Sequence, residues 1–329
     1  MFIKKFSRAR NWLPVLVSFA GFGSSLMVSE STFAWSRRGH AIVCETAAYL
    51  TEPAFLKKHS FDLGYYCNVP DLIWKKPEFY KVEWTNHFMN MENFIDAIKD
   101  SSELKRSYSL AREKFDSEYP QLKQTTGRAF WRIQELEQLL EKTSSLLKTA
   151  EFEKEARHKA QADWILQAGA LGHYIGDLSQ PFHVTQEYDG LKAGQKGIHA
   201  FFEEDLIDEL YGNGLGSEVM KVAKNHWPAY HKKAAKKSVL DLVIELMETS
   251  NKKIDTILAL DKKIGRTDLV KAAKAHRAII VDCLVNGALT QAEIMNRHTD
   301  WNYDGSKFFN FYGQPEYINP GNMGPSKSE

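Results

Sequence analysis

Long segments in which apolar residues recur every three or four positions constrain this chain most strongly. In residues 128–148, Phe130, Ile133, Leu136, Leu140 and Leu147 follow this spacing and so share one face of a helix. Similar reasoning predicts helices over residues 39–50, 153–180, 238–260 and 267–295, with Gly265 separating the last two. The 329 residues could form one large domain or two small ones. Because no long stretch alternates apolar and polar residues, we expect an all-α fold, arranged as a single multi-helix domain.

The segment from His173 to His183 contains three potential metal ligands. His173 and Asp177 are four residues apart, so they stand on the same face of the predicted helix. Pro181 ends that helix, which frees His183 to face a different ion. Taken alone, the first pair favours an ordinary hydrogen-bonded pair on a helix, with His183 a loop histidine by chance.

Other histidines and carboxylates extend this pattern. His199 and Glu203 repeat the four-residue spacing, and Asp71 precedes His87 in a loop-like segment. His40 begins the first predicted helix. Imidazole and carboxylate are the ligands that zinc takes where a site keeps an open position for catalysis, whereas structural zinc sites rely on cysteine. The sequence therefore predicts a zinc site with an open coordination position.

The first 34 residues have the order of a secretory signal. Basic residues precede a mostly apolar stretch over residues 12–28, and small residues then lead to Ala34. An uncleaved membrane anchor is the alternative, but glycines and serines within the apolar stretch weaken it. We expect cleavage after residue 34 and a secreted or periplasmic protein.

Charge and cysteine content exclude some classes of site. A formal net charge of +1 argues against a general surface for binding polyanions. Three cysteines allow at most one disulfide within the chain. Cys44 lies in an apolar helical context that favours a packed thiol, and a Cys67–Cys283 bridge remains possible.

Two segments are expected to lack regular structure. Residues 186–198 should form a loop along one side of the site, and residues 319–329 should form a disordered tail.

Together these residues resemble the superfamily of secreted zinc-dependent phospholipases C and single-strand-specific zinc nucleases. The resemblance runs in motif order from Trp35 to Glu203 and continues through the closing helices, and its central motif is the histidine, aspartate, histidine run with Gly176, Gln180 and Pro181. It implies an all-helical domain over residues 35–318, packed around a cleft with three zinc ions.

The resemblance also implies which residue binds which ion. One zinc is assigned to Asp71, His87, His173 and Asp177, and a second to His183, His199 and Glu203. The third is assigned to the amino group and carbonyl oxygen of Trp35, to His40, and to Asp177, whose carboxylate would bridge two ions. Cleavage before Trp35 is then a condition for the third site, because only cleavage frees its amine.

Such a centre implies hydrolysis of a phosphate ester. Neighbouring divalent ions can lower the pKa of a bridging water towards neutrality and neutralise phosphoryl and leaving oxygens. We expect the bridging hydroxide to attack phosphorus in line, and Asp71 to orient or deprotonate it. The zinc held by His183, His199 and Glu203 would stabilise the leaving oxygen.

The substrate stays open between a phospholipid headgroup and a single-stranded nucleic acid or nucleotide. The short spacing from Trp35 to His40 is similar to the nucleases, whereas Glu203 and the short gap between His183 and His199 are similar to the phospholipases. Trp74 and Asn90 depart from the nuclease pattern, where a basic residue and an aspartate are typical. Phe88 and Asn90 are the candidate substrate residues, although Phe88 could also simply pack beneath the ions.

Three functions follow from these observations. The first is a phospholipase C-like enzyme, favoured by a small margin. The second is a single-strand-specific endonuclease or 3′-nucleotidase. The third is a catalytically silent zinc-binding protein. No stable protein partner is implied by any of them.

Overall fold

A computed structural model describes residues 35–75, 83–92, 116–117, 120, 125–149 and 154–305 of the chain. The chain divides into Met1–Ser31 and Thr32–Glu329. The first unit, which holds most of the predicted signal peptide, lies outside the described residues, as does the predicted tail over 319–329.

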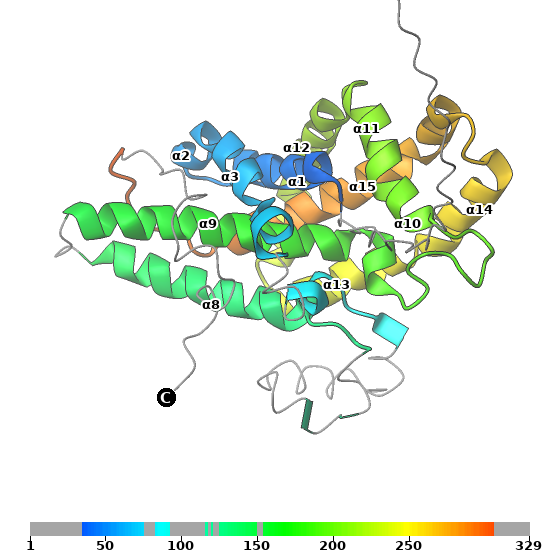
Figure 1. Ribbon diagram of the computed structural model, residues 1–329. Helices are drawn as coiled ribbons and strands as arrows, with labels where there is room; N and C mark the ends of the chain where they lie inside the picture. Colours follow the sequence, from blue (N-terminus) through cyan, green and yellow to red (C-terminus); the bar gives the residue numbers. More distant parts are fainter. Residues whose placement is uncertain are drawn as a thin grey trace, which may run out of the picture. The chain divides into compact units, whose positions relative to one another are not determined.

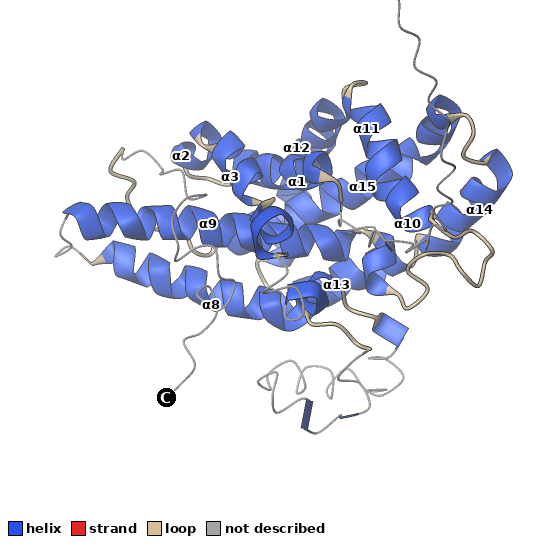
Figure 2. Ribbon diagram, viewed as in Figure 1, coloured by secondary structure: helices blue, strands red, loops and turns tan. Residues whose placement is uncertain are grey.

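The described residues are helical, with one isolated β-bridge between Met89 and Gly127, so the all-α prediction is confirmed for them (Figures 1 and 2). The α-helices are α1 (Arg37–Leu50), α2 (Ala54–Lys58), α3 (Ser60–Tyr66), α8 (Ala129–Lys148), α9 (Lys154–Ser179), α10 (Ile198–Ala200), α11 (Leu206–Tyr211), α12 (Leu215–Ala234), α13 (Val239–Asn251), α14 (Ile254–Ile264) and α15 (Leu269–Asn296). Short helical turns of other types are η1 (Pro70–Trp74), η2 (Trp84–His87), η4 (Pro181–Val184) and η5 (Phe201–Asp205).

Helix α9 is the centre of the core. It packs against α8, which runs beside it in Figure 1, and also against α1, α3, α13 and α15. Its second half, from Trp164 to Ser179, is almost entirely buried. Gly172 permits this packing, because a Cβ there would lie 2.1 Å from Nε2 of Gln291 and 2.3 Å from Sγ of Cys44. The helix that carries His173 and Asp177 is therefore held on all sides.

Four predicted helices lie within two residues of their observed bounds, but the region 238–260 differs. It consists of α13 and α14, separated at Lys252 and Lys253. The turn there tightens, since the amide of Lys253 donates to the carbonyl of Ser250 at 3.0 Å, and the Ser250 hydroxyl donates to the carbonyl of Leu246. Short polar side chains that bond to the backbone in this way compete with helix continuation.

Helix α12 was not predicted from the sequence. It buries Leu215, Val219 and Ala223 at four-residue steps, which is the spacing of a helix face. Pro228 lies inside the helix and Gly214 precedes it with a φ of 80°. Both residue types are signals of interruption, so they obscured the periodicity.

Among the described residues, only α15 is long and apolar enough to cross a membrane by length and composition. Its most apolar window is 78% buried inside the protein, which identifies α15 as a core helix.

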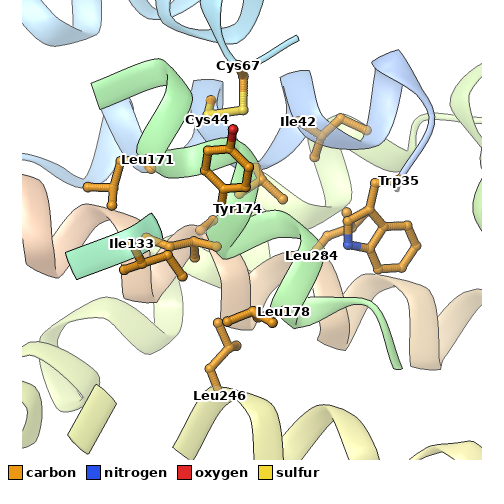
Figure 3. Close-up of a cluster of buried hydrophobic side chains, with 14 of the residues drawn as sticks. Trp35, Ile42, Cys44, Cys67, Ile133, Leu171, Tyr174, Leu178, Leu246 and Leu284 are labelled. Atoms are coloured by element: carbon orange, nitrogen blue, oxygen red, sulfur yellow. A yellow bond between two sulfur atoms is a disulfide. The ribbon is translucent and has the colours of Figure 1, made fainter. Parts of the chain in front are cut away.

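The prediction that Cys44 is a packed thiol was wrong, and the bridge left open between Cys67 and Cys283 does not form. Cys44 of α1 and Cys67, directly after α3, form a disulfide, whereas Cys283 is a buried free thiol (Figure 3). Helices α1 and α3 pack against each other, and this proximity brings the two sulfurs together. Pairing depends on that packing, which spacing along the chain does not reveal.

Removing the disulfide is expected to destabilise the protein. The bond closes a loop with a sequence separation of 23 residues, and a Cys44→Ala/Cys67→Ala variant should lose about 3 kcal/mol of unfolding free energy. Urea unfolding of the oxidised protein measures this loss. Cys283→Ala is the control, because it removes a buried sulfur without a cross-link and should cost only about 1 kcal/mol. Equal urea midpoints for the two variants would contradict the disulfide.

Candidate metal centre

Three groups of buried histidine and carboxylate side chains could hold metal ions. Within each group, the candidate ligand atoms lie within 4.8 Å of one another. The groups are His40, His173 and Asp177; Asp71, His87 and His173; and His183, His199 and Glu203. Eight of the nine predicted ligands belong to these groups, and the ninth, Trp35, lies beside them.

The end of α9 separates the groups in the way that its sequence predicted. His173 and Asp177 occupy one face of α9, which ends at Ser179. Gln180 then caps the turn η4, accepting a hydrogen bond from the amide of Phe182 at 2.5 Å. His183 lies in that turn and joins the group of His199 and Glu203.

The carboxylate of Asp177 faces two groups at once. Its Oδ2 lies 3.0 Å from Nδ1 of His87 and 3.6 Å from Nε2 of His173. Its Oδ1 lies 3.4 Å from Nε2 of His40 and has no hydrogen-bond partner among the residues that the structure describes. This placement fits a carboxylate that bridges two cations.

Asp71 and His87 complete the first predicted ion site. Oδ1 of Asp71 lies 3.7 Å from Nδ1 of His87 and 3.7 Å from Nε2 of His173. Asp71 lies on η1, a π-helical turn that is closed by a hydrogen bond from the amide of Lys75 to the carbonyl of Pro70. Turns of this kind are frequent at functional sites.

Trp35 is fully buried next to the group of His40 and Asp177. Its indole Nε1 donates to Oγ of Ser179 at 3.0 Å, and the amide of Ser36 donates to the carbonyl of Glu203 at 3.1 Å. Gly176 leaves room for His40, because a Cβ there would lie 2.8 Å from Nδ1 of that histidine. In the full chain the nitrogen of Trp35 belongs to a peptide bond with Ala34.

The third group is built on a second π-helical turn. His199 lies on α10, and Glu203 lies on η5. Nε2 of His199 is 2.9 Å from Oε2 of Glu203 and 3.0 Å from Nε2 of His183. Gln180 donates to the same Oε2 at 2.8 Å, whereas Oε1 of Glu203 has no hydrogen-bond partner in the described part of the chain. A buried carboxylate oxygen left without a donor fits a cation ligand.

Backbone carbonyls orient two of the histidines. Nδ1 of His173 lies 2.8 Å from the carbonyl of Cys67, and Nδ1 of His183 lies 2.6 Å from the carbonyl of His87. A carbonyl only accepts, so each Nδ1 donates and each Nε2 carries the lone pair that faces its group. Such backbone contacts commonly fix the tautomer of histidines that bind metals.

The pKa shifts leave two of the histidines in the neutral form that binds metals. Burial, together with the positive charge of Lys75, lowers the pKa of His87 and His173 well below the ordinary range, so both rings are neutral. Burial and the nearby Asp71 raise the pKa of Asp177. Burial alone would raise the pKa of Glu203, but His199 and His183 bring it down to about 2. Neutral imidazoles and crowded carboxylates are the donor set that zinc prefers.

A hollow of about 290 Å³ opens onto these groups. The candidate ligands His87, His183 and His199 line it, together with the aromatic rings of Trp84, Phe88, Phe182 and Tyr188. Both candidate substrate residues, Phe88 and Asn90, line it as well. Asn90 donates from Nδ2 to the carbonyl of Thr125 at 2.7 Å. Tyr188 belongs to the segment 186–198, so the predicted loop contributes to this wall.

Lys75 is a site residue that was not identified from the sequence. Trp74, at the position where the nuclease pattern has a basic residue, is fully buried, whereas Lys75 lines the hollow. Nζ of Lys75 lies 2.6 Å from Oδ1 of Asp71. Burial would lower the pKa of Lys75, but Asp71 more than offsets this and raises it, so the ammonium stays charged. The residue that follows Trp74 thus supplies a positive charge to the site.

The Cys44–Cys67 disulfide also bears on the centre. It joins α1, which carries His40, to the residue whose carbonyl orients His173.

In comparisons with known proteins, no family model matches this chain and no curated protein sequence matches it. The candidate metal centre therefore rests on the residues and geometry of this chain.

Proposed function

We propose that this protein is a secreted zinc-dependent phosphodiesterase, phospholipase C-like in its substrate. The observation that carries the proposal is the placement of Asp177, whose two oxygens face two groups of histidines beside an aromatic hollow. Three ligand groups this close suit a substrate with several negative oxygens, and a phosphate ester is such a substrate.

The ligand residues fit zinc, and the chain supplies other parts of the reaction. Zinc bound at such sites supplies an activated water at neutral pH and stabilises charge on phosphoryl oxygens. Asp71, which is 7% exposed, orients the attacking water and accepts its proton. The ammonium of Lys75, at the wall of the hollow, attracts the anionic phosphate.

The aromatic wall binds the organic part of the substrate. Rings of Trp84, Phe88 and Tyr188 favour either a choline-like cation or a base, because both bind to aromatic faces. The phospholipase reading rests on Glu203 and on the short gap between His183 and His199.

A single-strand-specific nuclease or 3′-nucleotidase is the second candidate. It is favoured by Trp84 and Phe88, whose ring centroids lie 5.9 Å apart at the hollow. The rings meet edge to face at 61°, so an unstacked base could stack on the open face of one of them, and Asn90 lines the same hollow.

Secretion is also part of the proposal. The Cys44–Cys67 disulfide supports it, since disulfides persist mainly in oxidising compartments. Removal of the first 34 residues would further free the amine of Trp35, which gives processing a chemical purpose.

One substrate panel tests the proposal. Protein that begins at Trp35 is incubated with phosphatidylcholine, single-stranded DNA and RNA, each with zinc and with a chelator. Zinc-dependent release of phosphocholine supports the phospholipase proposal, and zinc-dependent cleavage of DNA or RNA supports the second candidate. Turnover of none of the three would overturn the enzyme proposal and favour a catalytically silent zinc-binding protein.

A further inference from the structure

Glu83 is a buried carboxylate that lies next to His87 and belongs to none of the candidate ligand groups. It is completely buried at the start of η2, four residues before His87. Its Oε1 accepts a hydrogen bond from the hydroxyl of Tyr174, and its Oε2 accepts one from Nδ2 of Asn86 at 3.0 Å. Both oxygens of Glu83 therefore act as acceptors.

The cost of this burial calls for a functional reason. Taking a carboxylate out of water costs several kcal/mol unless charges and donors compensate. Arg132, itself 3% exposed, provides a compensating charge, and its Cζ lies 5.7 Å from the ring centroid of Tyr174. An apolar side chain would fill the same space without needing an arginine, a tyrosine and an asparagine around it.

His87 is the residue that Glu83 can act on. Oε1 of Glu83 lies 3.3 Å from Nε2 of His87, a few tenths of an ångström longer than an ordinary hydrogen bond. Nε2 makes no hydrogen bond within the described part of the chain, and Oε1 of Glu83 is the carboxylate atom that faces it. The opposite ring nitrogen, Nδ1, faces Asp177 at 3.0 Å and Nε2 of His173 at 3.1 Å.

His87 thus differs from the other oriented histidines. His173 and His183 present Nε2 to their groups, and each has a backbone carbonyl at Nδ1. As a ligand through Nδ1, His87 would carry its proton on Nε2, where it faces the carboxylate of Glu83. A carboxylate partner makes the ring a better metal ligand than a carbonyl does, because its charge stabilises the positive charge that the imidazole gains on binding.

We infer that Glu83 is a positioning residue for His87: it accepts the Nε2–H proton, holds Nδ1 as the ligand atom and strengthens metal binding there. This inference rests on the proposed metal centre. The motif resemblance does not include Glu83, and the residue lies in a segment where the sequence predicted no site residue before His87.

Glu83→Gln tests the inference with little change in shape. The amide oxygen can still accept hydrogen bonds, but the negative charge is lost. Competition with a chelator should show that zinc binds about 10- to 100-fold more weakly at one site, which is the usual effect of removing such a partner. The visible spectrum of the cobalt-substituted protein should shift as well, since the electron density donated by the His87 ligand changes.

Glu137→Gln is the matched control. Oε1 of Glu137 lies 2.9 Å from Nε2 of His298, so this is also a carboxylate–histidine pair, but His298 belongs to none of the metal-ligand groups. The control should bind zinc as tightly as the wild type. Equal zinc affinity for wild type, Glu83→Gln and Glu137→Gln would overturn the inference.

A measurement without metal separates this inference from the proposed function. Nitrogen NMR of the wild-type protein with ¹⁵N-labelled histidine should show His87 protonated on Nε2. Protonation on Nδ1 would overturn the role of Glu83. If wild-type protein binds no zinc, the proposed function fails, and the tautomer of His87 still decides whether Glu83 orients the ring.

Discussion

Asp177→Asn is expected to lower phosphodiester turnover at least about a thousandfold, the equivalent of roughly 4 kcal/mol of transition-state stabilisation. The carboxylate oxygens of Asp177 face His87 and His173 on one side and His40 on the other. Asparagine keeps the shape of the side chain but cannot supply a charge to two ions. Zinc content and turnover, measured on the same preparation, check the expectation.

A half-buried aspartate on the same helix, outside the three groups, provides the control. Asp163 of α9 pairs with Lys159 at 3.0 Å, and Asp163→Asn should keep full zinc content and turnover.

Burial and the nearby Asp71 raise the pKa of Asp177. In metal-free protein the charge on Asp177 therefore lowers the stability as the pH rises above the ordinary range of an aspartate. Metal-free Asp177→Asn should therefore melt at neutral pH no lower than metal-free wild type. An Asp177→Asn protein with full zinc and full activity would contradict the scheme.

The second large effect is expected at the amino terminus. Protein that begins at Trp35 should bind three zinc ions, whereas protein that retains Ala34 should bind two and turn over substrate about a hundredfold more slowly. The reason is that a retained Ala34 ties the amine of Trp35 into a peptide bond. Metal analysis and turnover of the two preparations check it.

The contacts of Trp35 should be the same with and without Ala34, so the two preparations should differ only in the free amine. The indole is held by Ser179 and the next amide by the carbonyl of Glu203, contacts that an additional residue at the terminus does not remove. Melting temperatures of the two metal-free preparations should therefore agree. Equal zinc content with and without Ala34 would rule out the amine as a ligand.

The sequence predicted which candidate ligands come together where these residues are close along the chain. His173 and Asp177 share a helix face by spacing alone, and Pro181 marks the turn that redirects His183. His199 and Glu203 keep a four-residue spacing that brings their side chains together even though η5 is a π-helical turn. For such pairs, local geometry decides the contact.

Contacts that depend on packing between distant segments could not be read in this way. The partner of Cys44 depends on how α3 lies on α1, and Lys75 reaches the site through the π-helical turn η1. Nothing in the sequence distinguishes Glu83 from other charged residues, because its partners Tyr174 and Arg132 come from α9 and α8. A residue that orients a metal ligand without being a ligand itself leaves no spacing pattern in the sequence.

Zinc stoichiometry tests the central claim most directly. Protein that begins at Trp35 is equilibrated with zinc by dialysis, and the bound metal is counted per chain. The arrangement of the three ligand groups around Asp177 predicts three ions, falling by two when Asp177 is replaced by asparagine. One ion or none per chain, or a count that Asp177→Asn leaves unchanged, would contradict a metal centre of three ions bridged by this carboxylate.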